Sequence, residues 1–332
     1  GSPFENTRMD NLTLNVTFSL VLESFAIPPE GVYPAFIFGM LSYCIILICN
    51  LAILLTVALE KHLHEPMYLL LINLPINDLI GATAFLPQLM KEILLDTRTI
   101  SYPACVTQAF FIHIYGGGSS LILTAMAYDR YVAICCPLRY NAIMTNTYVK
   151  KIITLIWITD LILMVVLFSL LLRLPRCQSM ISGTYCDNPS LLRLVCADIT
   201  INNIYGLFMT ALMQLVSVGT ITYTYLQILL TCLKNKHSDA KSKAIQTCAT
   251  HLVVFLMLEV SGLFTILSYR FERASPFLRK MFGASTLIFP PIMNPIIYGL
   301  KTKEIRKHYI YSNIYCNRSF YVLMEVNCYL CH

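Results

Sequence analysis

Charged residues are scarce in this sequence. Asp, Glu, Lys and Arg make up 13% of its 332 residues, whereas soluble globular proteins carry roughly 25%. Hydrophobic residues make up 57%, above the roughly 45–50% of soluble proteins. Although the net charge is +6, the basic residues are scattered between apolar runs and do not form the concentrated basic surface of a nucleic-acid-binding protein. The composition excludes a soluble catalytic or nucleic-acid-binding protein and indicates a membrane protein.

Signatures of catalysis and of metal binding are missing as well. The sequence has no HExxH and no GxSxG motif, the patterns that supply zinc-dependent or serine-nucleophile chemistry. The loop cysteines described below have no CxxC spacing and no histidines cluster near them, which argues against a zinc site. We therefore predict no enzyme activity, no catalytic residues, no cofactor and no metal centre.

Long apolar runs are present instead, and seven of them are long enough to cross a bilayer as helices. Four contain no charged residue, and three contain one acid each, namely Asp78, Asp160 and Glu259. The seven stretches are Gly31–Leu59, Pro66–Met90, Ser101–Tyr128, Ile152–Leu172, Ile199–Leu233, Ala244–Tyr269 and Met281–Leu300. We predict an all-α membrane protein, a seven-transmembrane helix bundle at 31–300 with an extracellular tail at 1–30 and a cytoplasmic tail at 301–332.

Two features predict an N-terminus outside the cell. Asn11 and Asn15 each begin an Asn-x-Thr glycosylation sequon, which is used only on the luminal or outer side. With that orientation the cytoplasmic segments hold 14 of the 24 Lys and Arg residues and the outer segments hold 10, in agreement with the positive-inside rule. Residues 1–30 lack the pattern of a cleavable signal peptide, so we expect the first span to target the chain. Lys301–Lys307 is expected to form a short amphipathic helix on anionic membrane lipid.

Four motifs lie at the ends of predicted spans. Leu63–Tyr68 reads LHEPMY, Met126–Cys135 reads MAYDRYVAIC, Lys243–Leu252 reads KAIQTCATHL, and Pro291–Tyr298 reads PIMNPIIY. This set, in this order, resembles the odorant (olfactory) receptors, a family of rhodopsin-like (class A) G-protein-coupled receptors. The LHEPMY form, together with His113, is more similar to the fish-type or class I branch.

The resemblance implies a function. It implies a plasma-membrane receptor that binds a small odorant between its helices and activates a heterotrimeric G protein of the olfactory stimulatory type. Two positions depart from the family pattern: Thr224 precedes Tyr225 where Ser is usual, and Glu259 stands where an aromatic residue is usual. A small-solute membrane transporter is the alternative, but the inverted repeat typical of many transporters is not evident.

Asp129 and Arg130 suggest a switch near the cytoplasmic side. An Arg beside an acid at a helix end can be held by that carboxylate in one state and released to a partner protein in another; the alternative is a charge pair that only anchors the helix. Pro295 removes a backbone hydrogen bond and should loosen the seventh helix. The resemblance assigns coupling or switching to Asp129, Arg130, Tyr131, His251, Asn294, Pro295 and Tyr298.

Three polar residues lie well inside different spans. A charged Asp at the centre of a membrane helix costs about 2.5–3.5 kcal/mol on insertion scales, so Asp78 is expected to find partners or an ion. The resemblance implies that Asn50, Asp78 and Asn294 form a polar core that can hold sodium and rearranges on activation. A static packing network is the alternative. For Asp160 we expect a role in helix packing.

Four cysteines fall at positions that face an oxidising compartment, where disulfides form. Cys105 begins the third span, and Cys177, Cys186 and Cys196 lie between spans four and five. Four cysteines allow three connectivities, among which the sequence does not choose. The resemblance implies the pairs Cys105–Cys186 and Cys177–Cys196.

A small ligand is expected in a pocket between helices, in the outer half of the bundle. His113 precedes Arg130 by 17 residues, roughly 25 Å along a helix, which puts His113 near the outer face. Gly116–Gly118 either allow close helix packing or leave room for a ligand. The principal ligand contacts are predicted to be His113, Gly117, Tyr205 and Ile266, together with Glu259 and Arg270. Further predicted lining residues are Ile114, Tyr115, Phe208, Met209 and Leu263.

Glu259 and Arg270 lie 11 residues apart, about three helical turns, and so project from nearly one face. If Arg270 and His113 anchor the ligand, a carboxylate is expected; if Glu259 does, an amine is expected. A zwitterion would use both. The alternatives are a solvated loop charge for Arg270, and for Glu259 a protonated or internally paired acid, with His113 as one candidate partner.

Overall fold

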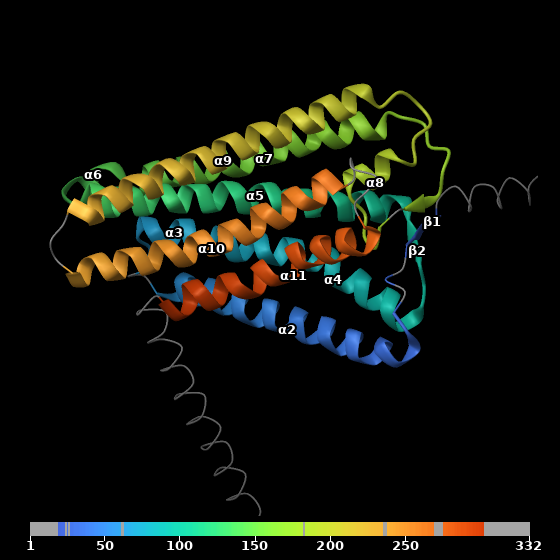
Figure 1. Ribbon diagram of the computed structural model, residues 1–332, viewed down its shortest axis with the longest axis horizontal. Coiled ribbons are helices and arrows are strands. Elements are labelled where there is room, and N and C mark those ends of the chain that lie inside the picture. Colours follow the sequence, from blue (N-terminus) through green and yellow to red (C-terminus); the bar gives the residue numbers. More distant parts are fainter. Residues whose placement is uncertain are drawn as a thin grey trace, which may run out of the picture.

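The computed structural model describes residues 19–23, 25, 27–60, 63–181, 183–234, 238–268 and 275–301. This part of the chain folds into a seven-helix bundle whose long helices run along a common axis (Figure 1). The long elements are α2 (Pro29–Leu59), α4 (Asn73–Leu95, preceded by α3, Pro66–Leu71), α5 (Tyr102–Cys135), α7 (Asn146–Leu172), α9 (Thr200–Lys234), α10 (Ser238–Ser268) and α11 (Pro276–Lys301).

Helix α5 occupies the centre of the bundle. It packs against α4, α7, α9 and α10, and α11 packs against α2, α4 and α10. By length and composition, five described helices can cross a membrane: α2, α3–α4, α5, α7 and α9. Within α10 the apolar part is Leu252–Ser268, because the helix begins with the polar segment Ser238–Lys243. The predicted all-α bundle is confirmed.

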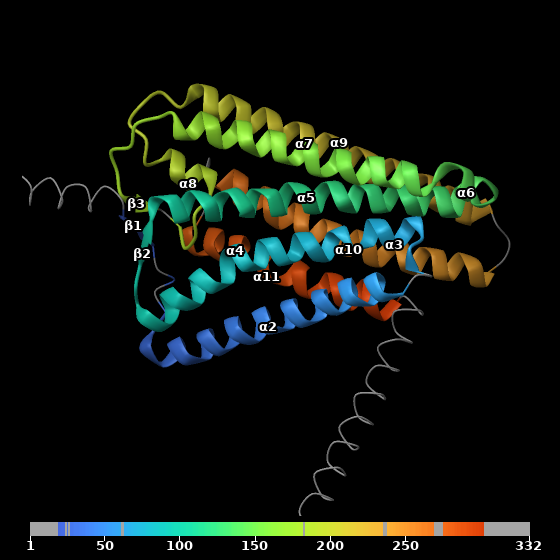
Figure 2. The ribbon, with the colours of Figure 1, turned by 180° about the vertical axis from the view of Figure 1, so that it is seen from behind.

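One end of the bundle carries a small sheet that the helical prediction missed. Strand β1 (Ser19–Leu22) pairs antiparallel with β2 (Thr99–Ser101) and parallel with β3 (Met180–Ile181), and Figure 2 shows the three strands beside α8 (Asn188–Leu192). Leu20 and Leu22 point inward and are 1% and 2% exposed. Part of the predicted N-terminal tail is therefore folded against the loops. We call this end of the bundle the sheet end.

The other end carries two short elements, a 3₁₀ turn at Pro137–Arg139 and α6 (Tyr140–Ile143). Figure 1 shows α6 opposite to β1 and β2. We call this end the α6 end. The sequons at Asn11 and Asn15 and the segment Thr302–His332, with most of the predicted amphipathic helix, lie outside the described residues.

Tyr115 links three of the helices. A side chain at Gly81 of α4 would collide with the Tyr115 ring, so the absence of a Cβ lets α4 and α5 approach closely at this point. The Tyr115 hydroxyl donates a hydrogen bond to the backbone oxygen of Thr286 in α11, at 3.0 Å. Its ring is 1% exposed.

Trp157 and Asn73 connect α7 with α4. The indole Nε1 of Trp157 donates to Oδ1 of Asn73 at 2.9 Å, while Nδ2 of Asn73 donates to the backbone oxygen of Leu69 at 2.7 Å. Asn73 is 6% exposed. Because lipid offers no hydrogen-bond partners, this contact holds the two helices in register.

We predict that Trp157→Phe destabilises the bundle by about 1–3 kcal/mol, because it leaves a buried acceptor unpaired. Thermal unfolding of purified protein in detergent measures the change as a lowered Tm. In an Asn73→Leu background the same substitution should cost clearly less, since the acceptor is already absent. An equal loss in both backgrounds would show that only the volume of the indole matters.

Candidate functional site

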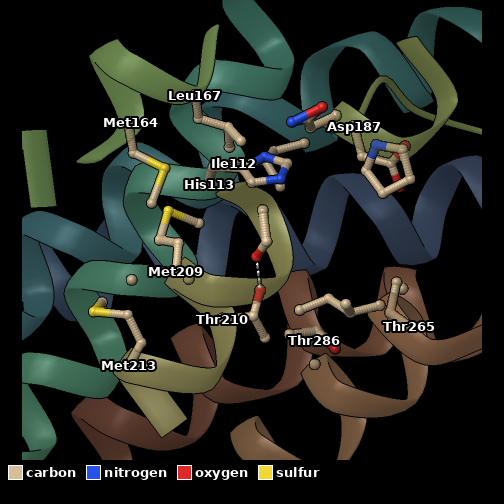
Figure 3. A pocket seen from close by; sticks show the side chains of 18 of the residues that line it. Ile112, His113, Met164, Leu167, Asp187, Met209, Thr210, Met213, Thr265 and Thr286 are labelled. Carbon is tan, nitrogen blue, oxygen red and sulfur yellow. Dashed lines mark hydrogen bonds between the residues drawn. The ribbon is translucent and has the colours of Figure 1, made fainter. Parts of the chain in front are cut away.

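A cavity of about 450 Å³ lies within the bundle toward the sheet end, between α5, α7, α9, α10 and α11. Figure 3 shows Met164, Met209 and Met213 on one side of it and Thr265 and Thr286 on another. Ile112, Leu167 and Ile266 add apolar surface. The size and mainly apolar lining are typical of small-molecule sites. The flexible methionine side chains can adapt to ligands of different shape.

A loop held by disulfides covers the cavity. Cys105 of α5 is bonded to Cys186, with Cα atoms 5.4 Å apart, and Cys177 is bonded to Cys196, with Cα atoms 5.8 Å apart. These are the two pairs that the family resemblance implied. The backbone N–H of Cys186 also donates to Oε1 of Gln108 in α5, at 2.8 Å. The residues that follow Cys186 are thereby fixed over the cavity.

Tyr185 closes the cavity on the side of α4 and α11. Its ring meets the Phe85 ring edge to face, with centroids 5.4 Å apart, and its hydroxyl occupies the space that a Cβ would take at Gly283. Burial, together with the nearby Asp187 carboxylate, raises the pKa of Tyr185 well above its ordinary range, so the phenol stays neutral. Asp187 lines the cavity and caps α8 by accepting from the backbone N–H of Ser190, at 2.8 Å.

The three consecutive glycines of α5 serve both purposes considered from the sequence. The position of a Cβ at Gly117 is taken by the carboxylate of Asp160, and that at Gly118 by the side-chain amide of Asn77. At Gly116 a Cβ would meet no atom within 4 Å, and Gly116 and Gly117 both line the cavity. Two of the glycines therefore admit polar side chains of neighbouring helices, and Gly116 leaves open volume.

Glu259 lies in the cavity wall and is 6% exposed. Its Oε1 accepts from the hydroxyl of Ser120 in α5 at 2.7 Å, and its Oε2 accepts from Nε2 of Gln214 in α9 at 2.5 Å. The acid thus joins α10 to two other helices. It is internally paired, as one alternative from the sequence expected, and its partners are Ser120 and Gln214. Oε1 of Gln214 is buried without a hydrogen-bond partner in the described part.

His113 lies at the cavity (Figure 3). Its Nδ1 is 2.8 Å from the backbone oxygen of Ala109, and its ring meets Phe168 edge to face at 5.6 Å. Because a carbonyl oxygen only accepts, Nδ1 carries the proton.

Other predicted lining residues divide into two groups. Gly117, Tyr115, Met209 and Ile266 line the cavity. Tyr205 is not among the residues that line the cavity; its hydroxyl donates to the backbone oxygen of Leu163 in α7 at 3.1 Å. Ile114, Phe208 and Leu263 are also absent from the cavity lining; Phe208 is 63% exposed on the bundle surface.

Some predicted residues cannot be placed, and some lining residues were missed. Arg270 and the side chains of His251 and Tyr298 lie outside the described part. Asp187, Asn188, Asn202 and Gln214 line the cavity but were not predicted. Gln214 had a usable signal, an amide inside an apolar span, whereas the loop residues Asp187 and Asn188 had none.

At the α6 end the structure gives Asp129 and Arg130 partners other than each other. Oδ1 of Asp129 accepts from the hydroxyl of Tyr140 at 2.8 Å, and Nη2 of Arg130 donates to Sδ of Met67 at 3.0 Å. Burial and the nearby Asp129 raise the pKa of Tyr140, so its hydroxyl keeps its proton and donates. The contact with Met67 brings the LHEPMY motif to the DRY motif. Asp129 and Arg130 thus each contact another segment of the chain as well.

The polar core joins α2, α4 and α11. Nδ2 of Asn294 donates to both carboxylate oxygens of Asp78, at 3.1 and 2.9 Å. Nδ2 of Asn50 donates to the backbone oxygen of Pro291 at 3.1 Å. That oxygen lacks its usual helical donor because the residue four positions later, Pro295, has no N–H. Asn50 thus satisfies the group that the proline leaves unpaired.

Comparison with known proteins agrees with this architecture. The family model described as olfactory receptor matches residues 39–317. The human olfactory receptor 52B2 is 37% identical over 269 residues, covering 80% of this chain and 83% of that protein. The human olfactory receptor 52N5 is 38% identical over 272 residues, covering 81% and 84%, and the human olfactory receptor 51I2 is 36% identical over 267 residues, covering 80% and 86%.

We predict that Gly117→Ala destabilises the bundle by about 1–3 kcal/mol, because the new methyl group overlaps the buried Asp160 carboxylate. Gly116→Ala, one residue earlier, is the matched control and should be tolerated, since its Cβ enters open volume. The Tm in detergent and the surface level in cells measure both. Shortening the acid in Gly117→Ala/Asp160→Ser should restore the Tm; an unrelieved loss would contradict the packing explanation.

Proposed function

This chain belongs to the olfactory receptor family, and from that premise we propose that it binds its odorant in the cavity between α5, α9 and α10. As a family member it is a multi-pass plasma-membrane receptor for odorants that couples to a G protein, and not an enzyme. Membership favours a receptor over the transporter alternative. The observation that carries the binding proposal is the cavity of about 450 Å³ beneath the disulfide-held loop, with Glu259 in its wall.

Our proposed orientation has the sheet end outside the cell and the α6 end in the cytoplasm. The sequons at Asn11 and Asn15 and the Lys and Arg distribution support it. So do the disulfides at the sheet end, because such bonds persist on the oxidising side of a membrane. The segment Lys301–Lys307 would then meet the inner leaflet and bind its anionic lipid.

The charge of the ligand follows from the hydrogen-bonding capacity left in the cavity wall. A carboxylate has about four lone-pair sites, and the contacts of Glu259 from Ser120 and Gln214 occupy two of them. Oε1 of Gln214 is also an acceptor, and among the described residues it has no partner. This wall therefore offers acceptors, which favours a ligand with a protonated amine. A carboxylate held by Arg270 and by the protonated form of His113, in which Nε2 also donates, is the second candidate.

Ligand binding at Glu259 can reach the α6 end through the helices themselves. The acid holds α10 to α5 and α9, so a ligand that competes for it alters how these three helices are joined. Helix α5 continues to Asp129, Arg130 and Tyr131, where Arg130 must leave Met67 to contact a G protein. The ligand acts only through its higher affinity for the active arrangement. We propose an olfactory stimulatory G protein as the partner.

The polar core can support a sodium ion. Oδ1 of Asn50 and Oδ1 of Asn294 are buried without partners in the described part of the chain. Asn294 contacts the Asp78 carboxylate, and Asn50 contacts the backbone oxygen of Pro291, three residues before Asn294. Oxygen atoms are the ligands that hard cations prefer. When bound there, the ion would neutralise Asp78 and favour the arrangement in which α2, α4 and α11 are held together.

We predict that Glu259→Gln weakens responses to amines by roughly 10- to 100-fold in half-maximal concentration, because a charge-assisted hydrogen bond is lost. Responses to carboxylic acids should change little. A cyclic AMP assay in cells, with a panel of amines, acids and amino acids, measures both responses, and the surface level of the receptor is measured in parallel.

In the same panel Arg270→Ala should abolish acid responses and spare amines. Unchanged acid potency would remove Arg270 from the site.

We predict that Arg130→Ala abolishes the ligand-dependent cyclic AMP signal while the receptor still reaches the cell surface, because the contact with the G protein is lost. Arg139, which ends the nearby 3₁₀ turn, provides a control, and Arg139→Ala should retain the signal. Accumulation of ligand inside cells without any signal would instead support a transporter.

A further inference from the structure

Asn202 carries a buried side-chain amide that has no hydrogen-bond partner among the described residues. It lies in the first turn of α9, is 1% exposed, and lines the cavity. In the described part of the chain neither its Oδ1 nor its Nδ2 has a hydrogen-bond partner. An unpaired amide removed from water costs about 1–3 kcal/mol, and such groups are rare in folded proteins. A group that enters the cavity would satisfy it.

Helical geometry places Asn202 at one end of the cavity. Met209 and Met213 follow it by 7 and 11 residues, close to whole numbers of turns, so the three share a face of α9. Gln214, which holds Glu259, follows Asn202 by 12 residues, a rise of about 18 Å. The cavity therefore has two separate polar ends along α9, one at Asn202 toward the sheet end and one at Glu259 deeper in the bundle.

A second unpaired amide oxygen belongs to the same end. Asn188, at the start of α8, lines the cavity, is 5% exposed, and has an Oδ1 without a partner in the described residues. Asp187 beside it also lines the cavity. The free groups here are the acceptor oxygens of Asn188 and Asn202 and the donor Nδ2 of Asn202. Asp187 and Arg193, the residues on either side of α8, both line the cavity, so charges of both signs lie near this end and neither an anionic nor a cationic ligand group is singled out.

We propose that Asn202 and Asn188 form a second polar subsite that binds a hydroxyl group of the odorant. A hydroxyl accepts one hydrogen bond and donates another. Its oxygen accepts from Nδ2 of Asn202, and its hydrogen goes to Oδ1 of Asn188 or of Asn202. A ketone can only accept, so it leaves the amide oxygens unpaired. The subsite rests on the proposed function in one respect, that the odorant enters this cavity, and it is independent of the charge preferred at Glu259.

The test compares secondary alcohols with the ketones of the same carbon skeleton, in a cyclic AMP dose–response assay on the full-length receptor. The wild type should respond to the alcohol at roughly 10-fold or more lower concentration than to the ketone. Asn202→Leu should remove this preference by weakening the alcohol roughly 10- to 100-fold, with the ketone nearly unchanged. Asn202→Ser keeps a group that donates and accepts, and should retain part of the preference.

Folding is not expected to confuse this test. Replacing an unpaired buried amide with an apolar side chain of similar size is close to neutral for stability, so surface level should stay at that of Thr222→Val, a polar-to-apolar change on the exposed side of the same helix. Equal losses for alcohol and ketone in Asn202→Leu, or no loss for either, would overturn the subsite.

A second variant tests whether odorants bind in the cavity at all, separately from the role of Asn202. Gly116→Leu places a side chain in the open volume of the cavity, and it should weaken every odorant, whatever its polar group. If Gly116→Leu abolishes responses and Asn202→Leu leaves the preference for alcohol over ketone unchanged, the cavity binds odorants but Asn202 does not bind their hydroxyl group. If Gly116→Leu has no effect on any ligand, the cavity itself is not the odorant site, and the subsite falls with it.

Discussion

Polar side chains inside a membrane bundle have no solvent to pair with, and most of this structure follows from that constraint. Several polar residues placed deep in the spans find their partners on other helices. Asp78 receives two hydrogen bonds from Asn294, and Glu259 receives one from Ser120 and one from Gln214. These contacts fix which helices are neighbours, a task that apolar packing alone performs poorly in lipid.

Some buried polar atoms in the described part of the chain lack a partner, and several of them lie at the cavity or in the polar core. Among the described residues, both amide atoms of Asn202 and the Oδ1 of Asn188 are unpaired at the cavity, and the Oδ1 atoms of Asn50 and Asn294 are unpaired in the polar core. Asp160 is a different case: both carboxylate oxygens are unpaired, and one fills the space left by Gly117. The unpaired atoms at the cavity and in the polar core are ones that a ligand or an ion could satisfy, whereas Asp160 fits where Gly117 has no side chain.

The sheet end and the α6 end are built differently. At the sheet end covalent bonds and a small sheet hold the loop, so that Tyr185 and Asp187 are fixed around the cavity. At the α6 end single contacts hold the motif, a hydroxyl to Asp129 and a thioether to Arg130. Continuous helices join the covalently held end, which contains the cavity, to an end held by noncovalent contacts. Such an arrangement is suited to signalling, because a small rearrangement at the cavity can release those contacts.

The sequence by itself determined the membrane class, the seven spans and the helical ends at which the motifs lie, because hydrophobic length and charge are local properties of the chain. It also singled out Asp78, Asp160 and Glu259, since acids are rare in such spans. The partners of those acids, the turn of Tyr205 toward α7, the strand at Ser19–Leu22 and the exposure of Asn202 to the cavity were decided only by the tertiary structure. Each depends on the rotation of one helix against another and on contacts between distant residues, which no local pattern encodes.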